Sequence, residues 1–315
     1  MCAALLYLLL AIVFRLAETV HKRGEPLRED AVLVGELRDH GRVVKQHDQD
    51  EERREDEECR GRLRNPTRSA RRAGVACGST MRAVILAGGL GTRLRPYTTI
   101  LPKPLVPIGD RPILAHILLQ LHSCGIRQVD LCVGHLGELI QVYFSQADAL
   151  PKDLELRWNW EDEPLGTAGA LRLIPDLRGT FVVMNGDILT TLDYRELIAF
   201  HERNGAALTV AMHARRVEID FGVIETEGDR ITGWREKPKL DYEVSMGIYV
   251  YDERALAHLP ADGPCQFPDL IQELLDTREK VSAFRSDAEW FDIGTVPEHQ
   301  RAVEAFERNP EVFAS

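Results

Sequence analysis

Short apolar runs alternate with amphipathic stretches from residue 81 to residue 315. An apolar run without polar interruption is typical of a strand buried on both faces, as in a parallel sheet covered by helices. Such runs occupy residues 83–87, 129–133 and 181–184. Between the first two, residues 111–124 place apolar side chains on one helical face, and Gly125 follows as a C-terminal cap. The pattern predicts βαβ units, and hence an α/β fold with a mostly parallel, three-layer sheet.

The segments up to residue 212 continue this alternation. Further strands are expected at 154–160 and 208–212, and further helices at 138–146, 167–173 and 194–203. Sheets of this kind bind ligands at the carboxyl ends of their strands. The loop after Ala87 and the segment Asn185-Gly-Asp187 are therefore expected at the same edge of the sheet.

The sequence after residue 212 predicts a less regular order of strands and helices. A hairpin is expected around residues 227–229, because Gly and Asp there favour a tight turn between two strand-like segments. The elements expected are strands at 221–225, 230–235, 244–251 and 281–285, a helix at 268–278, and a final helix with Pro297 in its first turn. No hexapeptide run follows residue 300, so no C-terminal β-helix is expected.

Residues 1–80 differ from the rest in composition. Residues 1–14 are apolar, but a membrane-spanning helix needs ~20 such residues, and no positively charged start or small-residue cleavage site marks a secretory signal. Residues 18–73 are dense in charge and offer few side chains for a core. Since Met81 stands directly before the first strand, we expect residues 1–80 to be a disordered arm or a mis-assigned start without firm membrane association, and residues 81–315 to be one globular domain.

Charge and cysteine content narrow the function classes. The first 80 residues carry 15 Lys and Arg against 14 Asp and Glu, a net charge of +1. Because the whole chain has a net charge of −11, residues 81–315 carry a net charge of −12. An acidic surface does not attract polyanions in general, and no aromatic residues interleave with the basic cluster at 60–72, so no nucleic-acid partner is expected. The six cysteines form no C-x-x-C pair, which favours free thiols in a reducing cytoplasm over disulfides or a zinc site.

A glycine-rich loop follows the first predicted strand. Gly88, Gly89 and Gly91 allow the backbone to turn tightly and bring its N–H groups close to an anion. Arg93 follows with a guanidinium group matched to phosphate oxygens, and Lys103 lies in the rigid segment Leu101-Pro-Lys-Pro-Leu-Val-Pro107. A strand ending in a glycine turn with a solvated arginine is the alternative for the loop alone. The second segment favours the phosphate-binding interpretation.

These segments resemble the sugar-phosphate nucleotidyltransferases, also called nucleotide-sugar pyrophosphorylases. LAGGLGTRLRP and LPKPLVPIGDRPIL are similar to the family's N-terminal signature, and EPLGTAGAL, NGD, FGVI, EKP and WFDIGT follow in the family's order. The resemblance extends from Met81 to Glu307 and is nearest to mannose-1-phosphate guanylyltransferase-like proteins. It implies a Rossmann-like nucleotidyltransferase sheet, mixed at one side, with an inserted sugar-binding hairpin region in a catalytic domain at 81–315.

The resemblance also implies roles for individual residues. Catalytic roles fall to Arg93, Lys103 and Asp187, and Mg²⁺ ligation to Asp187 and Asp292. The nucleotide-binding residues implied are Leu86, Ala87, Gly88, Gly89, Gly91, Thr92, Arg93, Gly166 and Thr167, and those for the sugar phosphate are Gly222, Glu236 and Lys237. Taken singly, the aspartates are equally compatible with turns, Glu236 and Lys237 with a surface ion pair, and Gly166-Thr167 with a helix start.

The reaction implied is attack by a sugar 1-phosphate oxygen on the α-phosphorus of a nucleoside triphosphate, with pyrophosphate leaving. The nucleophile is already an anion at neutral pH, so alignment and charge neutralisation suffice for catalysis. Mannose 1-phosphate with GTP is the leading substrate pair. Glucose 1-phosphate with dTTP or UTP, and heptose and amino-sugar phosphates, stay open, as does homo-oligomerisation.

Two other functions compete with this one. A dinucleotide-binding oxidoreductase would need G-x-G-x-x-G, but Leu94 occupies the place of the third glycine. A catalytically silent nucleotide-sugar sensor would be expected to have lost part of the charged set. Arg93, Lys103, Asp187, Lys237 and Asp292 are all present, which favours an enzyme.

Overall fold

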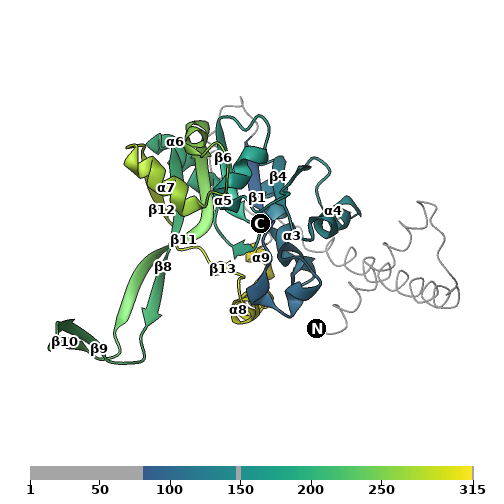
Figure 1. Ribbon diagram of the computed structural model, residues 1–315. Helices are drawn as coiled ribbons and strands as arrows, with labels where there is room; N and C mark the ends of the chain where they lie inside the picture. The colour runs from purple at the N-terminus through teal and green to yellow at the C-terminus, as the bar shows by residue number, and fades with distance from the viewer. Residues whose placement is uncertain (1–80, 147–149, 314–315) are drawn as a thin grey trace, which may run out of the picture. The chain divides into compact units, whose positions relative to one another are not determined.

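The computed structural model describes residues 81–146 and 150–313. The predictions for residues 1–80, including the apolar start and the disordered arm, lie outside these ranges. Within them, no helix combines the length and apolar character needed to cross a membrane. The described residues belong to one compact unit, built on a central sheet with helices on both faces (Figure 1).

The central sheet has seven strands and is mostly parallel. In spatial order they are β12 (Val281–Arg285), β8 (Leu208–Glu218), β11 (Lys239–Asp252), β6 (Thr180–Asn185), β1 (Arg82–Leu86), β4 (Gln128–Val133) and β5 (Glu155–Trp160). β6, β1, β4 and β5 run parallel, whereas β11 runs antiparallel to both of its neighbours. The predicted fold class, a mostly parallel sheet that is mixed at one side, is confirmed. No β-helix occurs among the described residues.

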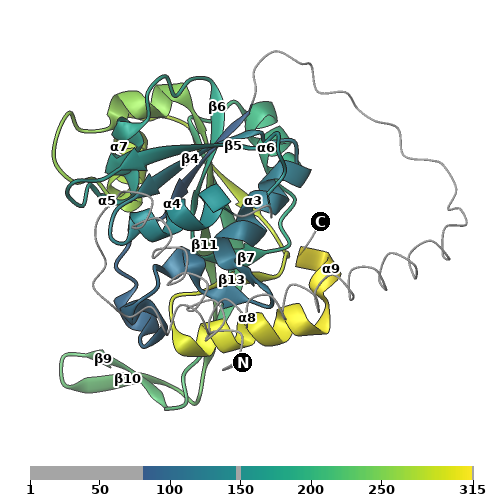
Figure 2. The ribbon, with the colours of Figure 1, turned by 90° about the vertical axis from the view of Figure 1, so that its right-hand side faces the viewer.

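The helices and short strands complete the layers. The α-helices are α3 (Ile113–Ser123), α4 (Gly137–Gln146), α5 (Gly166–Gly169), α6 (Tyr194–Asn204), α7 (Phe267–Asp276), α8 (Val296–Arg308) and α9 (Pro310–Phe313). The 3₁₀ turns are η1 (Thr92–Leu94), η2 (Tyr97–Thr99), η3 (Lys103–Leu105), η4 (Ala170–Leu173) and η5 (Glu253–His258). Two short pairs, β2 (Pro107–Ile108) with β3 (Arg111–Pro112) and β7 (Ile188–Thr190) with β13 (Trp290–Asp292), lie outside the main sheet. Figure 2 shows α8 next to β13.

The two faces of the sheet build separate cores because side chains alternate along each strand. On β1, Ala83 and Ile85 join the core covered by α3, α4, α6 and α8, whereas Val84 joins the core covered by α5, η4 and α7. All three side chains are fully buried. The apolar run at 83–87 thus reflects burial on both faces, as the sequence predicts.

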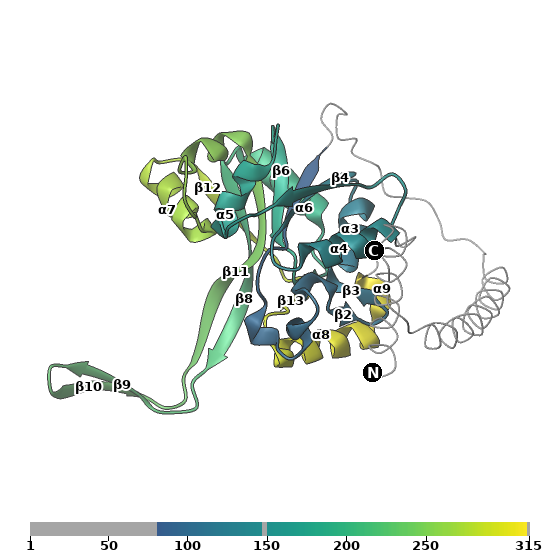
Figure 3. The ribbon, with the colours of Figure 1, turned by 45° about the vertical axis from the view of Figure 1, so that its right-hand side comes forward.

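β8 and β11 are much longer than predicted and leave the sheet together as a two-stranded ribbon. The hairpin of β9 (Val223–Glu227) and β10 (Arg230–Arg235) lies at the far end of this ribbon (Figure 3). The predicted strands stopped where charged residues begin. In the structure these residues pair across the ribbon, with Arg216 bonded to Asp241 at 2.7 Å and Lys239 to Glu218 at 2.7 Å. Opposite charges that face each other across two strands stabilise such a ribbon, and apolar residues alternate with the charged ones along the first part of β11.

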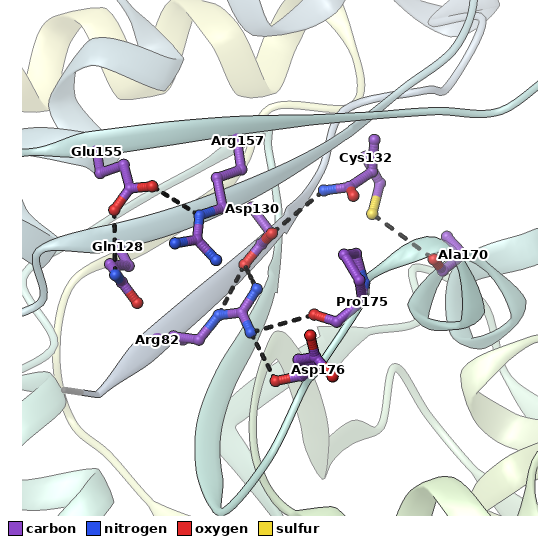
Figure 4. Close-up of polar contacts among 10 residues, drawn as sticks. Arg82, Gln128, Asp130, Cys132, Glu155, Arg157, Ala170, Pro175 and Asp176 are labelled. Carbon is purple, nitrogen blue, oxygen red and sulfur yellow. Dashed lines mark hydrogen bonds and ion pairs between the residues drawn. The ribbon is translucent and has the colours of Figure 1, made fainter. Parts of the chain in front are cut away.

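A buried ion pair ties three strands together. Asp130 of β4 is fully buried and accepts hydrogen bonds from Arg82 Nε at 3.1 Å and Nη2 at 2.6 Å. Arg82 Nη1 donates to the carbonyl of Asp176 at 2.9 Å (Figure 4). Asn159 of β5 donates to Asp130 at 3.4 Å. Every polar contact of this cluster is made within the fold, so its role is structural.

Asp130→Ala is expected to destabilise the protein by about 3–5 kcal/mol, because it leaves the buried Arg82 guanidinium without its carboxylate. Urea unfolding followed by circular dichroism measures the loss. Asp241→Ala is the matched control, since it removes an aspartate from an exposed ion pair with Arg216; it should unfold at nearly the wild-type urea concentration. Equal midpoints for the two variants would contradict the structural role of Asp130.

Candidate active site

The glycine loop after β1 is folded against the segment that carries Lys103. Gly91 has a φ of 61°, in the left-handed region that favours glycine, and its carbonyl accepts a hydrogen bond from Thr98 Oγ1 at 2.7 Å. A Cβ atom at Gly91 would lie 3.0 Å from Thr98 Cγ2 and 3.3 Å from Lys103 Cβ. The absence of a side chain at Gly91 therefore lets Lys103 approach the loop closely.

Asp187 lies beside the same loop because Gly186 packs on the end of β1. The Gly186 N–H donates to the carbonyl of Leu86 at 2.9 Å, and a Cβ atom at Gly186 would lie only 2.9 Å from that oxygen. A larger residue would push the backbone away from β1. The sequence motif Asn185-Gly-Asp187 thus has a steric reason for its central glycine.

Asp292 reaches this corner through the pairing of β13 with β7. Asp292 pairs with Ile188, and the Ile293 N–H donates to the carbonyl of Asp187 at 3.0 Å. Two aspartates more than one hundred positions apart in the sequence are therefore neighbours. The structure thus brings together the two aspartates to which the resemblance assigns Mg²⁺ ligation, and that ligation stays a prediction.

Two cations complete the cluster. Lys103 Nζ forms an ion pair with Asp187 Oδ2, and both side chains are largely buried. A Cβ atom at Gly294 would lie 3.5 Å from Asp292 Oδ1 and 3.6 Å from Arg93 Nη2, so the guanidinium faces Asp292 across this glycine. Arg93 forms no ion pair within the described residues, which leaves its guanidinium available for an anionic ligand.

The electrostatics of the aspartate pair favour a bound cation. Asp292 is partly exposed, yet desolvation raises the pKa of its carboxyl, and the charge of Asp187 raises this pKa further, against Lys103 and Arg93. The Oδ1 atom of Asp187 is buried without any hydrogen-bond partner in the described part of the chain. A carboxylate oxygen in this situation suits metal ligation.

The two carboxylates suit magnesium, an ion that does not need a site built from protein ligands alone. Among residues 81–146 and 150–313, no group of three or more His, Cys, Asp or Glu side chains is arranged to hold a metal ion. Magnesium commonly takes one or two carboxylates and completes its shell with phosphate oxygens and water. Asp187 and Asp292 supply two such carboxylates, so these residues fit the ion.

Gly166 and Thr167 make contacts within the fold rather than projecting free groups. The Thr167 hydroxyl accepts from the Phe267 N–H at 2.9 Å and lies 3.2 Å from Gln266 Oε1. A Cβ atom at Gly166 would lie 2.5 Å from the carbonyl oxygen of Cys265. These contacts join the start of α5 to α7, and nucleotide binding by the two residues stays a prediction.

The residues predicted to bind the sugar phosphate lie apart from the aspartate pair. Gly222, Glu236 and Lys237 flank the β9–β10 hairpin, which Figures 1 and 3 show at the far end of the ribbon from β7 and β13. Trp234 Nε1 donates to Glu236 Oε2 at 3.2 Å, and a Cβ atom at Gly222 would lie 3.1 Å from the same oxygen. The structure groups Gly222 with Glu236, but it does not bring them to Asp187.

One charged residue at the loop, Glu161, was not predicted from the sequence. It follows β5, and a Cβ atom at Gly88 would lie 2.9 Å from its Oε1 atom. Gly134, which follows β4, also packs against Gly88, since a Cβ atom at Gly134 would lie 3.3 Å from the Gly88 carbonyl oxygen. The signal available in the sequence was positional: a glutamate directly after a predicted strand belongs at the ligand-binding edge.

An apolar cavity of about 250 Å³ lies elsewhere, between α3, α8 and α9. Its walls include Phe306, Phe313 and the buried His116, whose pKa burial lowers and whose Nε2 donates to the carbonyl of Ile108 at 2.9 Å. It contains none of the loop, lysine or aspartate residues described above. The cavity is therefore separate from the charged cluster at the strand ends.

Comparisons with known proteins agree with this geometry. A family model described as nucleotidyl transferase matches residues 82–309. The chain is 32% identical over 244 residues to a UTP–glucose-1-phosphate uridylyltransferase of Synechocystis sp., covering 71% of this chain and 62% of that protein. It is also 32% identical over 222 residues to the mannose-1-phosphate guanylyltransferase catalytic subunit beta of Danio rerio, covering 68% and 61%. The chain thus spans less than two thirds of the length of these curated relatives.

Among solved structures, HddC from Yersinia pseudotuberculosis complexed with GMP-PN is similar in fold. The TM-score is 0.55 at 26% sequence identity, and the match covers 72% of this chain and 99% of that one.

Proposed function

Because the chain belongs to the nucleotidyl transferase family, we propose that it transfers a nucleotidyl group from a nucleoside triphosphate to a sugar 1-phosphate. A nucleoside-diphosphate sugar forms and pyrophosphate leaves. The observation that carries the proposal is the convergence of Arg93, Lys103, Asp187 and Asp292 beside the glycine loop. Two cations and two carboxylates at one strand edge suit a reaction between two polyanions.

The side chains provide positioning and charge neutralisation. The phosphate oxygen of the sugar 1-phosphate is already a nucleophile, so the site needs no general base, and the cluster contains none of the histidine-based pairs that would supply one. Arg93 would hold the triphosphate and stabilise the charge that develops on pyrophosphate. Lys103 would neutralise the α-phosphate, and the backbone N–H groups of Gly88–Gly91 would line the phosphates.

Magnesium is part of the proposal. Asp187 and Asp292 would hold the ion, since one oxygen of Asp187 has no other partner and the pair repel each other. When bound, Mg²⁺ neutralises charge on the phosphates and orients them for in-line displacement. Lys103, which pairs with Asp187, would contribute its positive charge to the same phosphates.

GTP with mannose 1-phosphate is the substrate pair we propose first. The Danio rerio relative is named as a mannose-1-phosphate guanylyltransferase, and the similar HddC structure is a complex with GMP-PN. Uridylyl transfer to glucose 1-phosphate is the second candidate, because the Synechocystis relative carries that name. Thymidylyl transfer to glucose 1-phosphate is a further candidate.

Pyrophosphate release tests the proposal directly. The full chain is incubated with Mg²⁺, each of GTP, UTP, dTTP and ATP, and a panel of hexose and heptose 1-phosphates. Release with at least one pair is expected, fastest with GTP and mannose 1-phosphate, and removal of the metal with EDTA should abolish it. A folded protein that releases pyrophosphate with no pair would overturn nucleotidyl transfer.

A further inference from the structure

The hairpin of β9 and β10 presents an exposed apolar face. Trp234 pairs with Ile224 across the hairpin. Ile231 pairs with Thr226, which lies two positions along β9 from Ile224. Directly opposed side chains of an antiparallel pair share a face, as do side chains two positions apart on one strand. Ile224, Ile231 and Trp234 therefore lie on the same face, and 47%, 59% and 60% of their surfaces are exposed. Phe221, just before β9, is also exposed.

No other element of the described residues covers this apolar face. β9 and β10 form a two-stranded sheet of their own, and Figures 1 and 3 show them apart from the central sheet and its helices. The opposite face of the hairpin is polar, since Arg235 and Glu225 form an ion pair there at 3.1 Å. A two-stranded hairpin by itself is only marginally stable in water, and an exposed apolar patch marks an interaction site. The hairpin is therefore suited to dock on another protein surface.

The arm, residues 212–245, consists of the ribbon and its hairpin and holds the hairpin away from the aspartate pair of its own chain. Along the ribbon, residues 212–218 pair with residues 239–245 without interruption. At the base of the ribbon, Arg215 is bonded to Glu298 of α8 at 3.4 Å. A continuous ladder with a fixed base keeps one direction. The residues predicted to bind the sugar phosphate therefore lie away from the metal site that they would have to serve.

The surface beside the glycine loop carries a second exposed apolar patch. Leu90 lies within the loop, and Ile100 directly follows η2; more than half of each side chain is exposed. The loop and η2 are packed together, because the Gly91 carbonyl accepts a hydrogen bond from Thr98 at 2.7 Å. Phosphate binding by the loop would use backbone N–H groups, so it gives no reason for an exposed leucine. This patch adjoins the segment that carries Lys103.

We propose that two copies of this chain exchange arms, so that the hairpin of each copy docks on Leu90 and Ile100 of the other. Glu236 and Lys237 of one copy then reach the aspartate pair of its partner, and the sugar 1-phosphate binds between two chains. The role of Glu236 and Lys237 rests on the proposed function, whereas the docking rests on the two apolar patches. Reciprocal exchange closes a two-fold symmetric dimer, covers both hairpins and leaves neither arm unpaired. Trp234 is the anchor that would set the position of Glu236, to which it is bonded at 3.2 Å.

Sedimentation of the full chain tests the docking without requiring turnover. The wild-type chain is expected to form dimers, and Trp234→Ser or Ile231→Ser on the arm should raise the dimer dissociation constant at least about tenfold, because each removes an apolar side chain from the interface. Ile100→Ser on the accepting surface should have the same effect. Leu275→Ser, which removes an exposed apolar side chain from α7, is the matched control and should leave the dimer intact.

Mixing two defective variants tests whether the site is shared. Asp187→Asn damages the metal site but keeps an intact arm, whereas Lys237→Ala damages the arm but keeps an intact metal site. After subunit exchange, half of the dimers contain one copy of each variant, and one of the two sites in such a dimer is complete. Pyrophosphate release should therefore rise from a small residual rate to about a quarter of the wild-type rate. A mixture of Asp187→Asn with Arg93→Met is the control, and it should recover nothing because neither copy then supplies an intact metal site and loop.

The outcomes separate the arm exchange from the reaction. A wild-type chain that stays monomeric, or a dimer that the arm substitutions leave intact, overturns the exchange. Dissociation by the arm substitutions but not by Ile100→Ser overturns docking at the glycine loop. Mixed dimers that recover no activity show that each arm serves its own chain, and they also overturn the exchange. A dimer that depends on both patches but releases no pyrophosphate with any substrate pair supports the docking and counts only against nucleotidyl transfer.

Discussion

Asp187→Asn is expected to lower kcat about a thousandfold or more while the protein stays folded. The amide keeps the size of the side chain but removes the charge that would hold Mg²⁺, and metal-based charge stabilisation contributes several kcal/mol to such reactions. The backbone contacts of this position remain, because Gly186 N–H and Asp187 O bond through the main chain. Pyrophosphate release at saturating Mg²⁺ measures the loss, and thermal unfolding checks the fold.

Asp262→Asn is the control for that change. It removes one negative charge from an exposed position before α7 and should leave kcat at the wild-type value. Activity of Asp187→Asn within a fewfold of wild type would remove the metal assignment. Loss of activity together with a large fall in the unfolding temperature would instead assign Asp187 a structural role through its pair with Lys103.

Arg93→Met is expected to lower kcat by about 10²–10³-fold. Its guanidinium faces Asp292 across Gly294 without forming an ion pair in the described part of the chain. It is therefore free to donate to the phosphates, and removal of one donor from a preorganised site typically costs this much in rate. The side chain is exposed, so the substitution should leave stability unchanged.

Arg93→Lys separates charge from geometry. Lysine keeps the positive charge but loses the planar fork, so partial activity between wild type and Arg93→Met is expected. Arg178→Ala, which removes an exposed arginine before β6, should behave as wild type. If Arg93→Met retained full kcat, the charge on the leaving pyrophosphate would have to be stabilised by Lys103 and the metal alone.

Much of the fold was predictable because hydrophobic periodicity reports local burial. The buried runs of β1, β4 and β6 were identified within one or two residues, and so were α3 and the β9–β10 turn. Gly247 of β11 lies against Asn185, whose side-chain nitrogen would lie 2.7 Å from a Cβ atom at Gly247. The lengths of β8 and β11 were wrong, because both strands are extended by pairing with each other across the ribbon, and neither segment alone shows that pairing.

The sequence by itself determined the order of the elements, the family, and the residues of the charged cluster, since each depends on local pattern or on motifs read along the chain. Only the tertiary structure decided which of those residues meet. The β7–β13 pairing brought Asp292 to Asp187, the long ribbon carried Glu236 and Lys237 away from them, and strand register placed Glu161 beside Gly88. These contacts join segments far apart in the chain, and register across a sheet is set by packing between strands, which no single segment encodes.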